Sequence, residues 1–534
     1  MGSGKNICFR RCDVEEIGVE MKEKDTLESK NIINIILTIL ILLIGLVFVY
    51  VNLVRYKAGL NADIAAEGLL AKVMWESKEW IPDEWYASTE TRLITPANFA
   101  SLFYGMTKDI CLSMGLACTV VGIFIMGSLW YLCKQLPFTM TQKLLLLLLI
   151  LILPNNRVMI ELMFTHAGYY ATHVALYFLT MALYTKMLKK DKVGKVEILF
   201  NLLLHFIIGI QGTRGILMIT GPLLAVEFVR HIYIWWSKKK EKREDIIVGC
   251  FVIATNMLGY LGDKIPLSVK LPISKHIRNA PRKIVEDVIP NFLSVFSWRS
   301  ISWIEKIVYI VCLGLVVYLV IGIVVKGIKR KEIKEEEWIF VNFFVSVFLT
   351  AMAITFTTMG SSNRYYVVIY FAIAMGITIL IGSSKKILRS CLIIFISFLF
   401  VTNCYKLYYP SIIDRSYEQH IYGKIGEYLI QEGYEYAYAD FINANTITVF
   451  NDGKVQVSAV NSFEDMSICK WLTSKNWYVP NVEKESKTAY IVPDKRADEM
   501  EEFLKKHKDD IEFKMKINDL SIYGSEINYS KLTD

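Results

Sequence analysis

The sequence predicts a polytopic α-helical membrane protein with about eleven transmembrane helices and a soluble α/β domain at its C-terminus. Of the 534 residues, 54% are hydrophobic and 21% are charged, whereas soluble chains have about 45–50% apolar and about 25% charged residues. The apolar residues form long runs separated by short clusters of Lys and Arg, and the last quarter of the chain has ordinary polar composition. This distribution excludes a soluble multidomain enzyme, a disordered chain and a fibrous repeat.

The net charge of +8 is divided unevenly along the chain. The tail from residue 409 to the end has 15 Lys and Arg against 22 Asp and Glu, so the tail carries −7 and the preceding part +15. Lys and Arg gather in the cytoplasmic loops of membrane proteins. Membrane topology therefore explains the positive charge, and nucleic acid is not predicted as a partner.

The first apolar run, residues 32–51, is long enough to cross about 30 Å of hydrocarbon. No cleavage site of small residues follows it, so we predict an uncleaved signal anchor. Ten further spans are predicted at residues 110–132, 143–158, 168–187, 195–211, 215–236, 246–262, 304–326, 338–358, 364–382 and 389–408.

Four connections rich in Lys and Arg determine the predicted orientation. They lie near residues 186–195, 238–243, 326–334 and 385–389, and the eleven-span plan places all four in the cytoplasm, as the positive-inside rule requires. The same plan divides the chain into a cytoplasmic segment (1–31), a transmembrane domain (32–408) with outer loops at 53–109 and 263–303, and an extracytoplasmic domain (409–534). The 263–303 loop has seven basic residues against three acids, which suits a lipid phosphate near the bilayer.

The tail has the alternation of strands and helices that is typical of a small α/β domain. Residues 437–441, 446–450 and 489–492 resemble strands, and residues 451–454 resemble a hairpin turn. Helical composition is found at 418–432 and 496–508.

The first outer loop holds the most informative stretch. Residues 61–72 are predicted to form a helix on the membrane surface, with an apolar face that includes Leu69 and Val73. Asp63 stands at the start of this helix, where a carboxylate can cap free backbone N–H groups. A carboxylate at the membrane interface can also act as a general base towards a sugar hydroxyl. The residues alone leave both interpretations open.

The order of these features resembles the GT-C membrane glycosyltransferases, including the protein mannosyltransferases and the bacterial aminoarabinose transferases. The shared features are one span, an outer loop with an early Asp, a helix of small residues, and then Trp-Ile-Pro-Asp-Glu-Trp-Tyr at 80–86 and Ser-Thr-Glu at 88–90. The resemblance implies a sugar donor on polyprenyl phosphate, inversion at the anomeric centre, and Asp63 as the catalytic base.

The sequence departs from the family at the residue after this aspartate. Many members have two adjacent acids there, whereas Ile64 follows Asp63, and the nearest second carboxylate is Glu67, one helical turn further on. A divalent metal is therefore not supported by an adjacent acidic pair. The ten cysteines have no spacing typical of a metal or redox site. No cofactor is therefore assigned, and a divalent metal stays an open alternative.

The second outer loop supplies further candidates. His166, Tyr170 and His173 stand at the outer start of a predicted span, and the GT-C resemblance implies that polar residues of this loop face the active site and bind substrate. The alternative for each histidine is a hydrogen-bonded residue at a helix end. Arg157 and Glu161 share the loop, and a local ion pair between them is a further alternative.

Two later outer turns carry arginines. The turn at 211–215 contains Arg214, which either faces a phosphate or snorkels to the interface. Residues 361–366 resemble the Arg-Tyr motif of the family, with Arg364 and Tyr365. A guanidinium suits a lipid phosphate because it donates paired N–H groups, but interfacial anchoring is an alternative for this pair.

These observations predict a multi-pass cell-membrane glycosyltransferase, a hexosyl or pentosyl transferase with a polyprenyl-phosphate sugar donor and an acceptor in the cell envelope. One rival is a transporter or flippase of envelope glycans, which requires charged residues buried within the spans; the spans are expected to contain almost none. A polymerase or ligase of surface polysaccharide is the other rival, and the basic 263–303 loop favours it.

Overall fold

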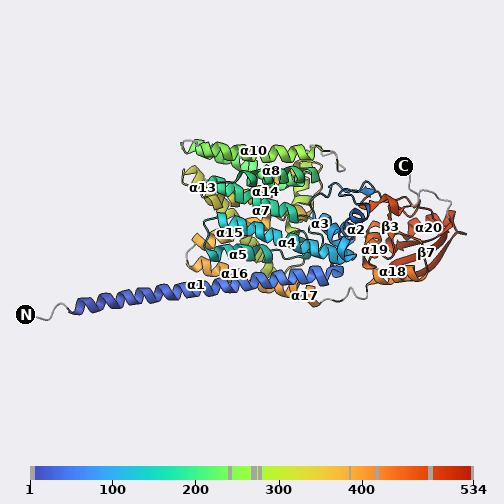
Figure 1. Cartoon of the computed structure of the whole chain (residues 1–534), viewed down its shortest axis with the longest axis horizontal. Coiled ribbons are helices and arrows are strands. Elements are labelled where there is room, and N and C mark those ends of the chain that lie inside the picture. Colours follow the sequence, from blue (N-terminus) through green and yellow to red (C-terminus); the bar gives the residue numbers. More distant parts are fainter. Residues whose placement is uncertain are drawn as a thin grey trace, which may run out of the picture.

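The computed structural model describes residues 6–189, 191–238, 243–265, 267, 274, 279–383, 386–413, 415, 420–478 and 485–530. Long helices form a bundle, and a small domain with a β-sheet lies at one end of it (Figure 1). The predicted basic residues Lys190, Lys239, Lys240, Lys242 and Lys385 lie outside the described residues.

Eight helices of the described residues are long and apolar enough to cross a membrane. They are Lys30–Val54 within α1 (Asn6–Val54), α4 (Ile110–Gln135), η2 (Ile216–Thr220) with α9 (Gly221–Trp236), α10 (Arg243–Asp263), α13 (Trp303–Ile328), α14 (Glu335–Phe356), η5 (Asn363–Tyr366) with α15 (Ile369–Ser383), and Ile387–Ile413, made of α16 (Lys386–Asn403), η6 (Cys404–Tyr408) and α17 (Tyr409–Ile413). The three other predicted spans coincide with α5 (Met140–Ile152), α7 (Ala171–Leu188) and α8 (Lys195–Gln211). All eleven predicted positions are thus helical, and eight of them are spans by length and composition.

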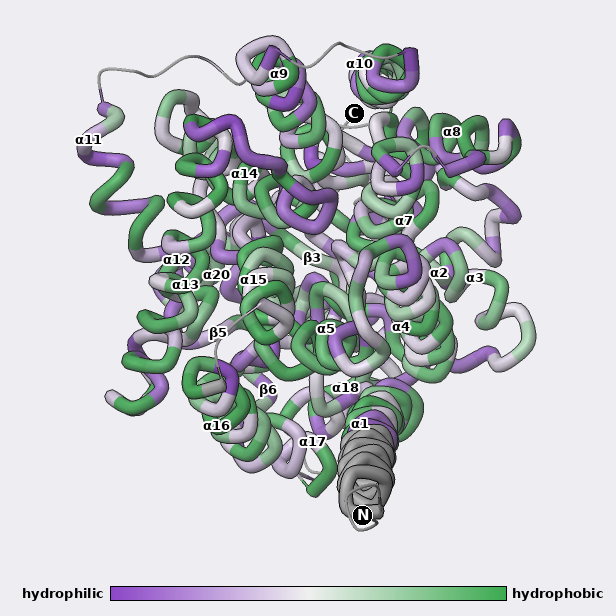
Figure 2. Tube along the Cα trace, turned by 90° about the vertical axis from the view of Figure 1, so that its left-hand side faces the viewer, coloured by the Kyte–Doolittle hydropathy of each residue, from purple (hydrophilic) through white to green (hydrophobic). Residues whose placement is uncertain are grey.

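The distribution of apolar side chains explains the bundle. In α5, every residue from Leu144 to Ile152 is buried, as a helix that is apolar on all sides requires. Helices at the periphery expose large apolar side chains instead, among them Ile307 and Val317 of α13, and Figure 2 shows apolar residues on the outer surface of the bundle. Exposure of so large an apolar surface to water is unfavourable, so lipid must cover it. The chain is therefore a multi-pass membrane protein.

The first loop folds into η1 (Tyr56–Gly59), α2 (Ala62–Ser77), β1 (Trp85–Tyr86) and α3 (Pro96–Thr107). The side chain of Asn61 caps α2 by accepting a hydrogen bond from the backbone N–H of Ile64 at 3.0 Å. The alternative interpretation of Asp63 as the cap is therefore wrong, because Asn61 is the cap and Asp63 lies inside the first turn. The helix itself is confirmed, but it packs against α3, α4 and the soluble domain rather than lying on an open surface.

The soluble domain has a five-stranded mixed sheet of order β3-β2-β5-β7-β6. Strand β2 is parallel to β3 and β5, whereas β7 is antiparallel to β5 and β6. Its elements are α18 (Ile421–Gln431), β2 (Tyr436–Asp440), α19 (Phe441–Phe450), β3 (Val457–Val460), β4 (Thr473–Ser474), β5 (Glu485–Pro493), α20 (Ala497–Lys506), β6 (Ile511–Ile517) and β7 (Leu520–Ile527).

One predicted strand of this domain is wrong. Residues 446–450 belong to helix α19, which begins after Asp440, whose carboxylate accepts from the N–H of Asn443 at 3.3 Å. Residues 451–454 therefore connect a helix to a strand and form no hairpin. Ile447 of α19 lies in the core of the soluble domain and Val449 packs against the first loop, so tertiary packing overrides their preference for strands.

The soluble domain is attached to the first loop at two places. Strand β1 pairs antiparallel with β4, and the N–H of Leu472 donates to the carbonyl of Tyr86 at 2.7 Å. Lys57 in η1 forms an ion pair with Asp452 at 2.6 Å. The first loop and the C-terminal domain consequently share one end of the helix bundle.

The loop after α10 contains α11 (Ala280–Lys283), η4 (Ile284–Val288) and α12 (Ile289–Ser294). Lys283 Nζ donates to the carbonyls of Ile354, Thr357 and Met359 at 3.2, 2.6 and 3.1 Å. A cation is favourable at the C-terminal end of a helix, and this contact fixes the loop to the end of α14.

The expectation that the spans contain almost no buried charge was wrong for α9. Glu227 and Arg230 are both buried there, and two pairs of their atoms approach to 2.8 Å. Asp245 of α10 pairs with Arg230 at 2.8 Å, and Tyr184 of α7 donates to Glu227 at 2.7 Å. Charged groups inside a membrane domain are paired in this way because the desolvation of a lone charge is costly.

Candidate active site

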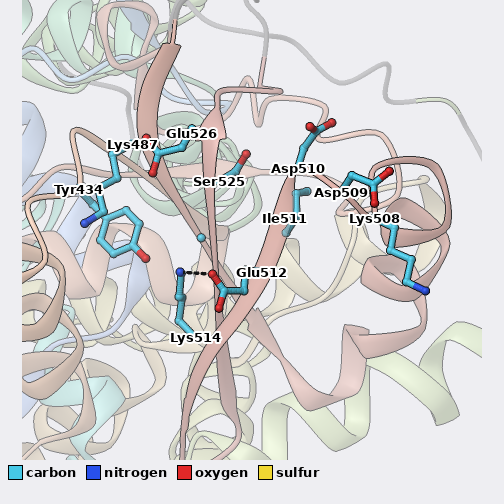
Figure 3. Close-up of a pocket in the computed structure, with 11 residues that line it drawn as sticks. Tyr434, Lys487, Lys508, Asp509, Asp510, Ile511, Glu512, Lys514, Ser525 and Glu526 are labelled. Atoms are coloured by element: carbon cyan, nitrogen blue, oxygen red, sulfur yellow. Dashed lines mark hydrogen bonds and ion pairs between the residues drawn. The ribbon is translucent and has the colours of Figure 1, made fainter.

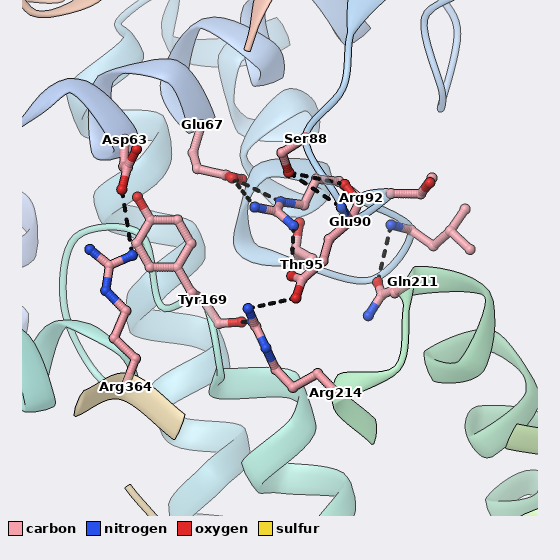
Figure 4. A network of polar contacts seen from close by, with 12 residues as sticks. Asp63, Glu67, Ser88, Glu90, Arg92, Thr95, Tyr169, Gln211, Arg214 and Arg364 are labelled. Carbon is pink, nitrogen blue, oxygen red and sulfur yellow. Dashed lines mark hydrogen bonds and ion pairs between the residues drawn. The ribbon is translucent and has the colours of Figure 1, made fainter. Parts of the chain in front are cut away.

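Asp63 and Arg364 meet where the first loop lies over the ends of the helices (Figure 4). Arg364 belongs to η5, and its Nη1 lies 3.4 Å from Asp63 Oδ2. The guanidinium also stands over the ring of Tyr169, 5.6 Å from its centroid. The side chains of Asp63 and Arg364 are 40% and 35% exposed, so a ligand can reach both groups.

Glu67 lies one turn further along α2 and is held by Arg92. Two nitrogens of Arg92, Nε and Nη2, approach the same oxygen of Glu67 at 2.8 and 2.7 Å, and the Glu67 side chain is only 3% exposed. Burial would lower the pKa of Arg92, but Glu67 and Glu90 beside it raise that pKa above its ordinary value. The Glu67 carboxylate is thus committed to a buried ion pair.

Glu90 joins this ion pair to Arg214. Its carboxylate contacts Arg92 Nη1 at 3.1 Å and Arg214 Nη2 at 2.6 Å. Burial alone would raise the pKa of Glu90, but the guanidiniums of Arg214 and Arg92 hold that pKa below its ordinary value. Arg214 also stacks on Tyr170, 3.9 Å from the ring centroid. The structure therefore places Arg214 in a protein ion pair.

The turn after α8 fixes the same part of the loop. The side-chain oxygen of Gln211 accepts from the backbone N–H groups of Leu93 and Ile94 at 3.1 and 2.7 Å (Figure 4). Together with the ion pairs of Glu90, these hydrogen bonds hold residues 88–95 against the helix bundle.

Glu161 ends the short helix α6 (Arg157–Glu161) and is buried. Burial raises the pKa of this carboxyl to about 7. The charges of Arg364 and Arg157 lower that pKa, and the charge of Asp63 raises it further, but burial is the largest effect. A carboxyl with this pKa exchanges its proton near neutrality, which suits general acid–base chemistry.

The two histidines of the second loop have different surroundings. His166 is buried, and its Nδ1 lies 3.1 Å from Thr165 Oγ1. Its Nε2 faces Gly59, where a Cβ on that residue would lie only 1.6 Å from Nε2. Burial lowers the pKa of His166 to about 3, with a smaller contribution from Arg157, so the ring is neutral. His173 stands in the first turn of α7 beside Tyr170, with 6.3 Å between ring centroids.

The predicted site residues thus fall into three places. Asp63, Glu67 and Arg364 lie in one cluster (Figure 4). Tyr170 is joined to that cluster through Arg214 and Glu90, and Tyr365 is half-buried next to Arg364. His166 packs on Tyr56 and Gly59 instead. The sequence analysis did not single out Glu90, Arg92 and Tyr169 as site residues.

Two other features bear on the chemistry of ligands. Within the part of the chain that the structure describes, no group of three His, Cys, Asp or Glu residues is arranged to hold a metal ion. On the soluble domain, an open cavity of about 460 Å³ is lined by both lysines and acids, among which Lys514 and Glu512 pair with each other (Figure 3).

Comparison with solved structures identifies the fold. The structure of ArnT from Cupriavidus metallidurans in the apo state matches with a TM-score of 0.54 over 91% of this chain and 97% of that chain, at 10% sequence identity. The chain has the GT-C fold.

Two structures of the oligosaccharyltransferase of Archaeoglobus fulgidus also match, each with a TM-score of 0.41. The complex with Zn and sulfate shows 8% identity over 85% of this chain and 68% of that chain. The AglB complex with an inhibitory peptide and a dolichol-phosphate shows 9% identity over 89% and 69%. No protein-family profile and no curated protein sequence matches the chain.

Proposed function

We propose that the chain is a glycosyltransferase that moves a sugar from a polyprenyl-phosphate carrier to an acceptor in the cell envelope, with inversion at the anomeric carbon. The observation that carries the proposal is the pair of Asp63 and Arg364, which places a carboxylate and a guanidinium together, partly exposed, where a loop covers the ends of membrane helices. The GT-C fold supports the same class of reaction.

Arg364 is the proposed contact for the donor phosphate. Of the three arginines in the cluster, Arg92 and Arg214 are held by the carboxylates of Glu67 and Glu90 at 2.6–3.1 Å. Among the described carboxylates, the one that Arg364 contacts is that of Asp63, at the longer distance of 3.4 Å. Its N–H groups therefore have the capacity to bind a phosphate through paired hydrogen bonds.

Asp63 is the proposed general base. In the reaction, the Asp63 carboxylate takes the proton of an acceptor hydroxyl while the hydroxyl oxygen attacks the anomeric carbon. The bond from that carbon to the phosphate oxygen breaks, and the polyprenyl phosphate leaves with the electron pair while Arg364 stabilises its charge. Glu67 is a poorer candidate because its carboxylate is paired with Arg92 and its side chain is only 3% exposed.

The proposed orientation places the first loop and the C-terminal domain outside the cell and the N-terminus in the cytoplasm. The four connections rich in Lys and Arg alternate along the chain with the loops that form the site. Lys and Arg gather in cytoplasmic loops, so the site loops are expected on the opposite side. Cysteine labelling of intact cells checks this orientation: a tail that reacts only after permeabilisation would contradict it.

Replacement of Asp63 by Asn tests the base. Asn61, not Asp63, caps α2, so Asp63→Asn should leave the thermal midpoint nearly unchanged. Removal of a general base should slow turnover of a polyprenyl-linked sugar by about 10²–10⁴-fold. Glu67→Gln is the companion variant, which should affect stability more than chemistry. Normal turnover in Asp63→Asn with loss in Glu67→Gln would assign the base to Glu67, and normal turnover in both would refute the reaction.

Replacement of Arg364 by Lys tests the donor contact. The charge is kept, but an ammonium cannot make the paired contact of a guanidinium. Donor binding by the purified protein should weaken by roughly tenfold, the equivalent of about 1.4 kcal/mol for one charge-assisted hydrogen bond. Equal donor affinity in Arg364→Lys would assign this arginine to membrane anchoring.

A transporter of envelope glycans is the second candidate, and the buried charges of α9 favour it. Glu227 and Arg230 are paired with each other and with Asp245 and Tyr184, as a packing role requires. A transporter predicts that Glu227→Gln abolishes glycan export while Asp63→Asn leaves it intact. The proposed enzyme predicts instead that Asp63→Asn abolishes sugar transfer while Glu227→Gln leaves it intact.

A further inference from the structure

A cleft lies beside the first membrane helix, next to the active-site cluster but separate from it. It has a volume of about 270 Å³ and is enclosed by the C-terminal end of α1, by residues 157–166, and by η6 with α17. Arg364 and Asp63 do not line it. The two residues to which the proposed reaction assigns a role therefore lie outside this cleft.

The walls of the cleft have two chemical characters. Val47, Phe48 and Val51 of α1 and Leu407 of η6 form an apolar part. Both segments belong to helices long and apolar enough to span a membrane. Leu46, the neighbour of Val47 in α1, is 63% exposed, as expected of a helix that faces lipid.

The other part of the wall is basic. Arg55, Arg157 and Lys406 come from three different segments and line the cleft together, and no acidic residue of the described chain is among the lining residues. Arg55 follows the last residue of α1, so the basic part lies where the span ends. Arg55 is held in place because it donates to the carbonyl of Ile412 at 3.2 and 2.7 Å, and Lys406 contacts Glu305 at 2.5 Å.

We propose that this cleft binds an anionic lipid, with the phosphate headgroup against Arg55, Arg157 and Lys406 and the first part of an acyl chain against the apolar wall. Basic pockets between membrane helices at headgroup level are suited to anionic lipids, and arginine binds phosphate through paired N–H groups. A free phosphate would leave the apolar wall without a partner, so a lipid fits the cleft better. This inference does not depend on the proposed reaction.

Lipid binding to the purified full-length protein in detergent tests the inference. The probes are dioctanoyl phosphatidylglycerol, dioctanoyl phosphatidylcholine and inorganic phosphate, with affinity measured by native mass spectrometry. We expect phosphatidylglycerol to bind at least about tenfold more tightly than phosphatidylcholine. Arg157→Gln should weaken this binding about fivefold, since one basic residue near anionic lipid contributes roughly that factor.

Three controls keep the result interpretable. Arg157 is exposed, so its replacement should not unfold the protein, and Lys406→Gln gives a second variant with the same expected loss. Arg299→Gln replaces an exposed arginine outside the cleft and should change nothing. Arg364→Lys should also leave phosphatidylglycerol binding unchanged, because a loss there would place the lipid in the donor site and overturn the inference.

Several other results would also overturn it. These are equal affinities for the two lipids, an unchanged lipid preference in both Arg157→Gln and Lys406→Gln, and inorganic phosphate that binds as tightly as phosphatidylglycerol. Failure of the Asp63 and Arg364 tests of the reaction would leave the lipid measurement unaffected, so the two proposals are distinguishable.

Discussion

Replacement of Glu161 by Gln should remove a pH dependence from the stability of the protein. Glu161 is 4% exposed at the end of α6. Burial raises the pKa of its carboxyl to about 7, although Arg364 and Arg157 oppose the effect. The folded protein therefore holds this proton more tightly than the unfolded chain does.

The magnitude follows from the difference between the two states. A rise in pKa from 4.5 to about 7 corresponds to about 3 kcal/mol, at 1.36 kcal/mol for each pH unit. Because the folded pKa is the higher one, this stabilisation is fully present below pH 4.5 and is lost as the pH rises through 7. Relative to Glu161→Gln, the free energy of unfolding of the wild type should fall by about 3 kcal/mol between these limits.

Thermal unfolding of the purified protein in detergent at pH 5, 6, 7 and 8 measures this effect. The midpoint of the wild type should decline with pH more steeply than that of Glu161→Gln. Glu76→Gln is the matched control because the Glu76 side chain is 54% exposed, and its profile should run parallel to that of the wild type. A Glu161→Gln profile that also runs parallel to the wild type would refute the reasoning.

Two further predictions concern the ion pairs that hold the first loop. Arg92→Met should destabilise the protein by about 3–5 kcal/mol because it leaves Glu67 buried without its partner. In a double-mutant cycle of unfolding, the additional replacement Glu67→Gln should recover about 1–3 kcal/mol of this loss. Purely additive losses would contradict the pairing. Lys57→Asp should weaken the attachment of the soluble domain and increase proteolysis within residues 53–109, since Lys57 and Asp452 form an ion pair at 2.6 Å. Asp452→Lys in the same chain should reverse the charges and restore protection. A double variant cleaved as fast as Lys57→Asp would show that this contact does not hold the loop.

The membrane part was predictable because the bilayer imposes a simple rule on the sequence. A helix that crosses hydrocarbon needs about twenty apolar residues, and every predicted span coincides with a helix. The rule weakens for helices enclosed by protein, because they do not face lipid. α7 is buried over most of its length, and its Thr180 Oγ1 lies 3.1 Å from both His205 Nε2 and Asn201 Nδ2 of α8.

The site was predictable only in part. Asp63 and Arg364 were found through a resemblance of motifs, and the structure brings them together across about 300 residues of chain. The ion pairs of Arg92 were missed because they depend on the path of a 57-residue loop, which local patterns do not determine. The one sequence feature that points to them is the closely spaced Glu90 and Arg92 in a stretch that is otherwise uncharged from residue 85 to 107.

The balance of charge in the cluster supports the proposal that a phosphate binds Arg364. Arg92 and Arg214 pair with the carboxylates of Glu67 and Glu90, whereas the charge of Arg364 acts on both Asp63 and Glu161. Burial raises the pKa of Glu161 to about 7, the charges of Arg364 and Arg157 oppose this rise, and the charge of Asp63 adds to it. One contact of 3.4 Å joins Asp63 to Arg364. In the proposed reaction, a phosphate takes the remaining N–H groups of Arg364, and the Asp63 carboxylate is left to accept the proton of the acceptor hydroxyl.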